Sequence, residues 1–134
     1  MTINNLQDSS DWRVLIVDDE PDNVLILESV LSLKGITCVS ALSAKDAEAL
    51  LEDFEPNLIL LDLSMPEVDG FTFLKILRER SDTASVPVIA VTAHVVRNKR
   101  EEVLEAGFNG YIVKPFDVFS LVATVQGILG FQTS

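Results

Sequence analysis

The stretch LILLDLSMPEVDG, residues 58–70, decides the fold of this chain. It opens with an apolar run from Leu58 to Leu61, Asp62 follows at once, and Gly70 marks the next boundary. A short apolar run bounded by turn residues is typical of a strand in a parallel sheet. We therefore expect Leu58–Leu61 to be such a strand, with Asp62 at its carboxyl end.

Four further runs of this kind lie on either side of the first, and stretches of helical period separate them. In one of these stretches Val24, Leu27 and Leu31 fall on a single apolar stripe. Strands that alternate with amphipathic helices form βαβ units around a parallel sheet. We therefore expect an α/β fold of five βα repeats over residues 13–131. The other four expected strands are Val14–Val17, Ile36–Val39, Val86–Val91 and Tyr111–Val113.

Length and composition indicate one globular domain. The chain has 134 residues, a length close to the ~150 residues of a typical single domain. Of these residues 48% are hydrophobic and 23% are charged, as in an ordinary globular protein. We expect a domain over residues 11–131, a flexible tail over residues 1–10 and a short tail over residues 132–134.

The first residues lack the basic and apolar regions of a signal peptide. The longest charge-free apolar-rich stretch, Val118 to Phe131, has 14 residues, fewer than the ~20 that a bilayer requires. These features predict a cytoplasmic protein without membrane contact.

The net charge argues against direct nucleic-acid binding. The chain has 21 acidic and 10 basic residues, which gives a formal charge of -11. Affinity for nucleic acids comes largely from Lys and Arg that neutralise phosphates. The single cysteine, Cys38, can form neither an internal disulfide nor a cysteine zinc site, and its apolar setting predicts a core position.

Side chains able to do chemistry follow four of the five expected strands. Asp18 and Asp19 follow the first strand, Asp62 follows the third, and Thr92 and Lys114 follow the fourth and the fifth. Taken singly, each has an ordinary explanation, because Asp and Thr commonly cap helices and a Lys before Pro usually lies in a solvated loop. Ligands of open α/β sheets nevertheless bind at the carboxyl ends of the strands, where these residues gather.

Together these residues predict a metal site. Three carboxylates beside one lysine leave a local charge of -2 (three negative charges and one positive), which destabilises the fold unless a cation binds. Carboxylate oxygens without His or Cys favour Mg²⁺, which takes one or two carboxylates, water and a substrate phosphate. The acidic stretch DDEPD, residues 18–22, would repel the phosphate of a flavodoxin-type cofactor, and neither GxGxxG nor GxxxxGK[ST] occurs.

Four motifs carry a resemblance to a known family. VLIVDDEP, LILLDLSMPEVDG, IAVTA and GYIVKPF, in this order over about residues 12–130, resemble the receiver domain of response regulators in two-component signalling. The resemblance implies a doubly wound, five-stranded parallel sheet of flavodoxin-like strand order 2-1-3-4-5. It also implies a single-domain signalling switch similar to the chemotaxis regulators.

The resemblance implies a role for each site residue. Asp62 is the expected phosphoacceptor, and Asp18, Asp19, Asp62 and the backbone carbonyl of Ser64 are the expected ligands of Mg²⁺. Thr92 and Lys114 are expected to contact the phosphoryl oxygens. Thr92 and Tyr111 are the expected switch residues, through a hydroxyl that moves toward the phosphoryl group and an aromatic ring that turns inward.

Three functions follow from these roles. The first is a stand-alone receiver that takes a phosphoryl group from a histidine kinase and catalyses only its own phosphorylation and dephosphorylation. The second is a relay intermediate that passes the group to a histidine phosphotransfer protein. The third is a phosphatase of the haloacid dehalogenase type, which is disfavoured because that family has an acid–base Asp at the position of Ser64.

The last third of the chain predicts a contact surface. On the expected fourth helix, Arg97, Lys99 and Arg100 precede Glu101, Glu102 and Glu105, the reverse of what the helix dipole favours. On the expected fifth helix, which we start at Val118, the face outside the apolar stripe has no charge and includes Phe119. We expect a homodimer or a partner site formed by helix four, strand five and helix five.

Overall fold

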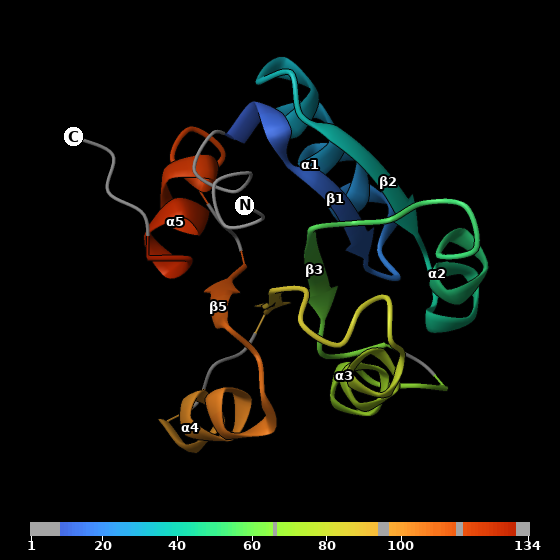
Figure 1. The fold of residues 1–134 in the computed structure, drawn as a ribbon. Helices are drawn as coiled ribbons and strands as arrows, with labels where there is room; N and C mark the ends of the chain where they lie inside the picture. Colours follow the sequence, from blue (N-terminus) through green and yellow to red (C-terminus); the bar gives the residue numbers. More distant parts are fainter. Residues whose placement is uncertain (1–8, 66, 94–96, 115–116, 131–134) are drawn as a thin grey trace.

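The computed structural model describes residues 9–65, 67–93, 97–114 and 117–130 (Figure 1). In this part of the chain, strands and helices alternate after a short 3-10 helix. The expected tails lie largely outside it, although Ser9 and Ser10 belong to the 3-10 helix. The elements are η2 (Ser9–Asp11), β1 (Arg13–Val17), α1 (Pro21–Leu33), β2 (Thr37–Ala41), α2 (Ala44–Leu50), β3 (Leu58–Asp62), α3 (Gly70–Glu79), β4 (Val88–Thr92), α4 (Arg97–Ala106), β5 (Gly110–Val113) and α5 (Leu121–Ile128).

The strands form one parallel sheet. Their order is β2-β1-β3-β4-β5, and every neighbouring pair runs parallel. The α/β class and the strand order 2-1-3-4-5 are therefore confirmed. Each crossover contains a helix, because parallel neighbours need a long connection that returns the chain to the same edge.

Helices cover both faces of the sheet. On one face α1 and α5 pack on alternate strand residues such as Val14 and Ile16, and on the other α2, α3 and α4 pack on residues such as Leu15 and Val17. Every residue of β3 and β4 is buried, which explains their continuous apolar sequence. Among the helices of the described residues, none is both long enough and apolar enough to cross a membrane.

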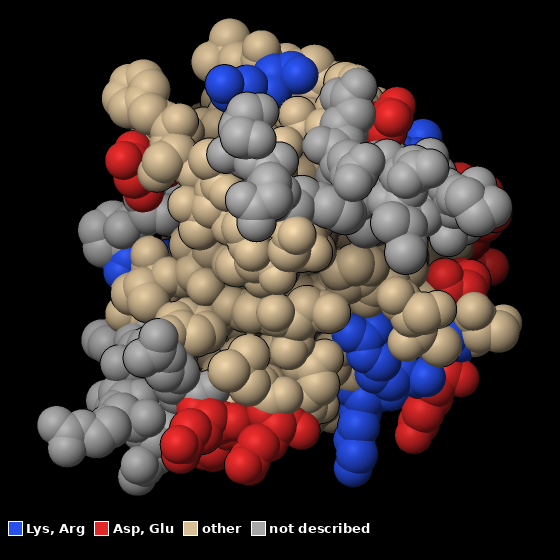
Figure 2. Space-filling view, turned by 60° about the vertical axis from the view of Figure 1, so that its left-hand side comes forward, with Lys and Arg blue, Asp and Glu red and all other residues tan. Residues whose placement is uncertain are grey.

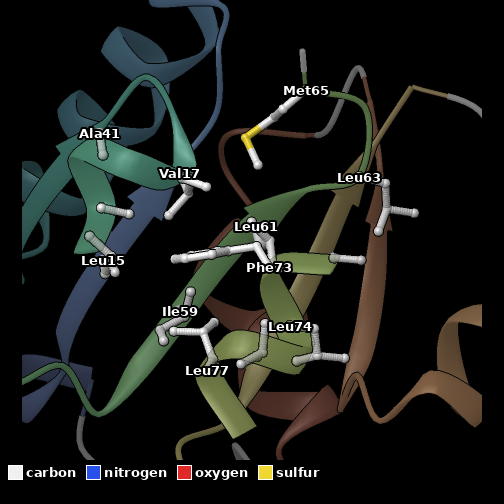
Figure 3. Close-up of a cluster of buried hydrophobic side chains, with 14 of the residues drawn as sticks. Leu15, Val17, Ala41, Ile59, Leu61, Leu63, Met65, Phe73, Leu74 and Leu77 are labelled. Carbon is white, nitrogen blue, oxygen red and sulfur yellow. The ribbon is translucent and has the colours of Figure 1, made fainter. Parts of the chain in front are cut away.

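Phe73 of α3 lies at the centre of the second face. Figure 3 shows its ring beside Leu61 of β3, with Leu74 and Leu77 continuing the apolar stripe of the same helix. Burying each of these side chains stabilises the fold by about 1.5–3 kcal/mol. Trp12, just before β1, is also buried, on the α1 and α5 face. The expectation that Cys38 is a core residue holds only in part, since it lies half-buried on the edge strand β2.

Two strands begin one or two residues later than expected, because backbone groups just before them form hydrogen bonds outside the sheet. The N–H of Val86 donates to the carbonyl of Thr83 (3.1 Å), and Arg78 donates to the carbonyl of Val86 (2.7 Å). β4 therefore begins at Val88 and not at Val86. Similarly, the N–H of Ile36 donates to the carbonyl of Leu31 at the end of α1, and β2 begins one residue later.

The expectation that the fifth helix starts at Val118 is wrong. Asp117 accepts the N–H of Phe119 at its side chain (2.9 Å) and the N–H of Ser120 at its carbonyl (3.2 Å), so residues 117–120 form a turn. An Asp side chain that bonds the backbone two residues ahead competes with helix formation. The helix starts at Leu121, and Phe119 projects from the turn before it.

The segment after β3 is held on both sides of Ser64. Leu63 and Met65 are buried in the core while Ser64 is exposed, and the N–H of Gly70 donates to the carbonyl of Leu63 (3.0 Å). Gly70 lies so close that a Cβ there would be 2.6 Å from the carbonyl oxygen of Asp62. Only glycine lets the first turn of α3 approach the end of β3 in this way.

We predict that Gly70→Ala lowers the free energy of unfolding by about 1–3 kcal/mol, because the methyl group meets backbone atoms that cannot rotate away. Urea denaturation measures this change. Gly127→Ala is the matched control, since a Cβ there meets nothing within 4 Å inside α5 and alanine favours a helix. Equal stability of Gly70→Ala and the wild type would refute the close approach.

Candidate functional site

The parallel sheet brings the expected site residues to one edge. Asp62 and Thr92 are the last residues of the neighbouring strands β3 and β4, and both are buried. Asp18 directly follows β1 and is also buried, and its N–H donates to the carbonyl of Ala41 in the neighbouring segment (3.1 Å). Lys114 directly follows β5, where its N–H donates to the carbonyl of Thr92 (2.7 Å). The carboxyl ends of four strands therefore form a single site.

The ammonium of Lys114 is the positive centre of this site. Its Nζ lies 2.9 Å from Asp18 Oδ2, 3.2 Å from Glu20 Oε1 and 3.5 Å from Asp62 Oδ2. Burial lowers the pKa of Lys114, but the carboxylates of Asp18, Asp62 and Glu20 together raise it by more. The pKa of Lys114 therefore lies above its ordinary value. Lys114 therefore remains charged at neutral pH.

Asp62 is a buried acid whose charged form the site disfavours. Its side chain is 4% exposed, and Oδ1 accepts the N–H of Ser64 (3.0 Å). The pKa of Asp62 is raised from 3.8 to about 6, and burial is the largest cause. The bond from Ser64 and the charge of Lys114 lower it, whereas the neighbouring Asp18 raises it. The carboxylate is thus held in one orientation in an environment that penalises its charge.

The carboxylates that meet at the site suit a hard divalent cation. One oxygen each from Asp18, Glu20 and Asp62 lies within 4.8 Å of the others. Asp18 Oδ2 is buried and accepts no hydrogen bond, although the ammonium of Lys114 lies close to it. A donor set of carboxylate oxygens, one of them buried with an ion pair but no hydrogen bond, fits Mg²⁺.

The three carboxylates differ from the expected set in one member. Asp19 was expected beside Asp18 and Asp62, and among the described residues the group whose oxygens lie within 4.8 Å consists of Asp18, Glu20 and Asp62. The N–H of Glu20 donates to Asp18 Oδ1 (2.9 Å), and this turn carries the Glu20 side chain toward Lys114. The only signal in the sequence was the acidic run 18–20, which cannot show which of three adjacent carboxylates turns inward. The roles of Asp19 and of the Ser64 carbonyl as metal ligands stay predictions.

The two expected switch residues lie on adjacent strands. Thr92 is the buried last residue of β4, and Tyr111 is a half-buried residue of β5 beside Ala90. Tyr111 packs against the cluster on the α2, α3 and α4 face. Thr92 therefore lies at the site, and Tyr111 lies on the neighbouring strand, which contacts α4.

Comparison with known proteins identifies the family. The model of the response regulator receiver domain matches residues 14–126. The chain belongs to this family. The predicted resemblance is therefore confirmed.

Similar proteins cover nearly the whole receiver. An uncharacterised 14.6 kDa protein of Leptolyngbya boryana is 37% identical over 121 residues, 90% of this chain and 92% of that protein. The chemotaxis protein CheY4 of Vibrio cholerae has a TM-score of 0.81 at 28% identity, over 87% of this chain and 98% of that one. The receiver domain of the sensor histidine kinase PA1611 from Pseudomonas aeruginosa has a TM-score of 0.77 at 30% identity, over 89% and 98%, and holds a magnesium ion in its active-site cleft. The receiver thus matches other receivers in extent as well as in fold.

We predict that Asp62→Asn stabilises the metal-free receiver at pH 7 by about 1–2 kcal/mol. Because the pKa of Asp62 is raised in the folded state, folding favours its protonated form, and its contribution to stability falls as pH rises from about 4 to 6. Denaturation in chelator across this range should show a difference between the two proteins that grows with pH and then levels off.

Asp82→Asn is the control of opposite sign. The hydrogen bond from Arg80 to Asp82 (3.0 Å) lowers the pKa of Asp82, so this carboxylate contributes stability that is present above its unfolded pKa. Its removal should make the receiver slightly less stable at pH 7. A difference for Asp62→Asn that does not change with pH would contradict the raised pKa.

Proposed function

We propose that this receiver accepts a phosphoryl group on Asp62 from the phosphohistidine of a sensor kinase or of a histidine phosphotransfer protein, in a reaction that requires Mg²⁺. The observation that carries the proposal is the buried Asp62 carboxylate, oriented by Ser64 and facing the Lys114 ammonium at the carboxyl edge of the sheet. The buried carboxylate of Asp18 beside it supplies an oxygen ligand for a cation. The magnesium reported for the PA1611 receiver supports the same cofactor here.

The residues present can carry out the transfer. An oxygen of the Asp62 carboxylate attacks phosphorus, the P–O bond forms as the P–N bond breaks, and the electron pair returns to the imidazole of the donor. Lys114 neutralises charge on the phosphoryl oxygens, and the Ser64 N–H holds Oδ1 so that Oδ2 faces the ammonium. Mg²⁺ bound by the acidic group would neutralise the remaining phosphoryl charge. Water later hydrolyses the acyl phosphate, so the receiver catalyses only its own phosphorylation and dephosphorylation.

The switch reaches the surface through β4 and β5. The Thr92 hydroxyl would move toward the phosphoryl group, and Tyr111, on the next strand, would turn inward into the space that Thr92 leaves. Support comes from the buried position of Thr92 and the half-buried position of Tyr111 in adjacent strands. The output would be a change in partner binding at α4, β5 and α5.

We predict that acetyl phosphate with Mg²⁺ adds one phosphoryl group to the wild type and none to Asp62→Asn, as intact-mass spectrometry will show. The reason is that Asp62 supplies the attacking oxygen. Chelation of the metal should abolish the modification, and Asp53→Asn, which removes an exposed carboxylate far from the strand ends, should leave it unchanged. If Asp62→Asn were modified to the same extent as the wild type, the assignment of Asp62 as the nucleophile would be wrong.

Two alternative functions separate in the same assay. When a histidine phosphotransfer protein is added to the phosphorylated receiver, a relay intermediate would pass the phosphoryl group to that protein. A terminal switch would instead lose the phosphoryl group to water. A phosphatase of the haloacid dehalogenase type would turn over a phosphomonoester repeatedly. Ser64, which is exposed and offers its backbone N–H to Asp62, supplies no acid–base group for that turnover.

We also propose that α4, β5 and α5 form the contact surface, either for a second copy or for a partner. Figure 2, in which the α5 side comes forward, shows a broad region without charged side chains. Exposed apolar side chains on these elements are Leu104, Val113 and, in the turn before α5, Phe119, which is 93% exposed. Glu101, Glu102 and Glu105 of α4 are exposed, so the uncharged part of this surface lies at β5 and α5. Molecules with a net charge of -11 repel one another, and two copies can meet at this uncharged part at the lowest electrostatic cost.

We predict that beryllium trifluoride with Mg²⁺, which mimics the phosphoryl group, increases self-association in sedimentation velocity. Phe119→Asp and Tyr111→Ala should each reduce it, because the first places a charge in the contact and the second disables the switch. Leu33→Asp is the matched control, since Leu33 is an equally exposed apolar residue (88%) on α1. If the receiver is a monomer in every condition, a homodimer is excluded and a different protein remains as the partner of this surface.

A further inference from the structure

Lys114 lies closer to the end of β1 than to the proposed phosphoacceptor. Its ammonium is 2.9 Å from Asp18 and 3.2 Å from Glu20, but 3.5 Å from Asp62. Asp18 is buried, whereas the Glu20 side chain is 61% exposed, and it reaches in from the surface to the ammonium. Two carboxylates thus lie closer to the ammonium than Asp62 does, and one of them, Glu20, reaches it although burial does not force its side chain into the site.

The Glu20 side chain is held in this orientation by its surroundings. Glu20 is the N-cap of α1, yet its side chain makes no capping bond to the helix. Instead Glu20 Oε1, the same oxygen that contacts Lys114, accepts a hydrogen bond from Asn23 Nδ2 (2.6 Å). The N–H of Glu20 donates to Asp18 Oδ1, which fixes the backbone of the turn. The Glu20 side chain therefore does not cap α1 and points toward the Lys114 ammonium.

We propose that Glu20 is a positioning residue that holds the Lys114 ammonium toward β1 in the unphosphorylated receiver. The ammonium must leave Glu20 to pair fully with a phosphoryl group on Asp62. The Glu20 contact therefore opposes the phosphorylated state and lowers the affinity of the site for a phosphoryl group. This inference rests on the proposed function, because it assumes that Asp62 receives that group.

A role of Glu20 as a simple cation ligand makes the opposite prediction. Glu20 belongs to the group of three carboxylates that could hold a metal ion. Loss of a ligand would weaken Mg²⁺ binding and, with it, binding of a phosphoryl mimic. Loss of a lysine tether would instead strengthen binding of the mimic once Mg²⁺ is saturating. Separate titrations of Mg²⁺ and of the mimic distinguish the two roles.

The test measures the affinity of the full chain for beryllium trifluoride at saturating Mg²⁺, by ¹⁹F NMR and calorimetry. Glu20→Gln should bind the mimic about two- to fivefold more tightly than the wild type, the range expected for one exposed ion pair. Glu20→Asp keeps the charge but is one methylene shorter, so it should bind more tightly as well. Asn23→Ala, which frees the Glu20 side chain, should act in the same direction and less strongly. Asp22→Asn removes one exposed charge on the same helix and should have no effect.

The outcomes separate the possible failures. Affinity of Glu20→Gln equal to or below that of Asp22→Asn overturns the proposal, as does tighter binding by Glu20→Gln without any change in Glu20→Asp, which would indicate charge alone. Absence of binding by the wild type itself, with Mg²⁺ present, would overturn the proposed function together with this inference. Thermal melts of each variant in chelator verify that the fold is intact.

Discussion

Parallel pairing of strands that are buried on both faces is the constraint on which the rest of this molecule depends. Helices on both sides leave no room for polar side chains within β3 and β4, so such side chains occur only where the strands end. Parallel neighbours end at the same edge, and their loops must start there. The site is therefore a consequence of the sheet, and its residues need no contact with one another along the chain.

The two edges of the sheet differ in how their charges are satisfied. At the amino edge the Arg78 guanidinium donates to the carbonyls of Thr83, Val86 and Gly107 and to the side chain of Asn109, and this ties the loops around β4 and β5 together. At the carboxyl edge one ammonium faces three carboxylates, and a buried oxygen of Asp18 accepts no hydrogen bond. The first arrangement stabilises the fold, and the second stores a local conflict that a cation and a phosphoryl group can relieve.

α4 connects these two edges of the sheet, from the carboxyl end of β4 to the amino end of β5. α4 is joined to the core at its carboxyl end, where Val103 and Phe108 are buried and the Phe108 ring meets Phe71 edge-on at 5.7 Å. Its amino end follows Thr92, which belongs to the site. Its carboxyl end leads into β5, which packs beside it and is followed by Lys114 at the site. The proposed contact surface is thus adjacent to the elements that the switch would move.

The sequence by itself determined the five βα repeats, the strand order through its family resemblance, and the positions of Asp18, Asp62, Thr92 and Lys114 at the strand ends. These are properties of period and order, which hydrophobic burial imposes on any chain of this pattern. Only the tertiary structure decided that Glu20 joins Asp18 and Asp62, because Lys114, which its carboxylate contacts, lies 94 residues away. It likewise decided that Phe119 lies in a turn, since the hydrogen bonds of Asp117 replace helical ones that the apolar period alone would allow. Side-chain direction and helix starts depend on contacts between distant segments, and these exist only once the sheet has formed.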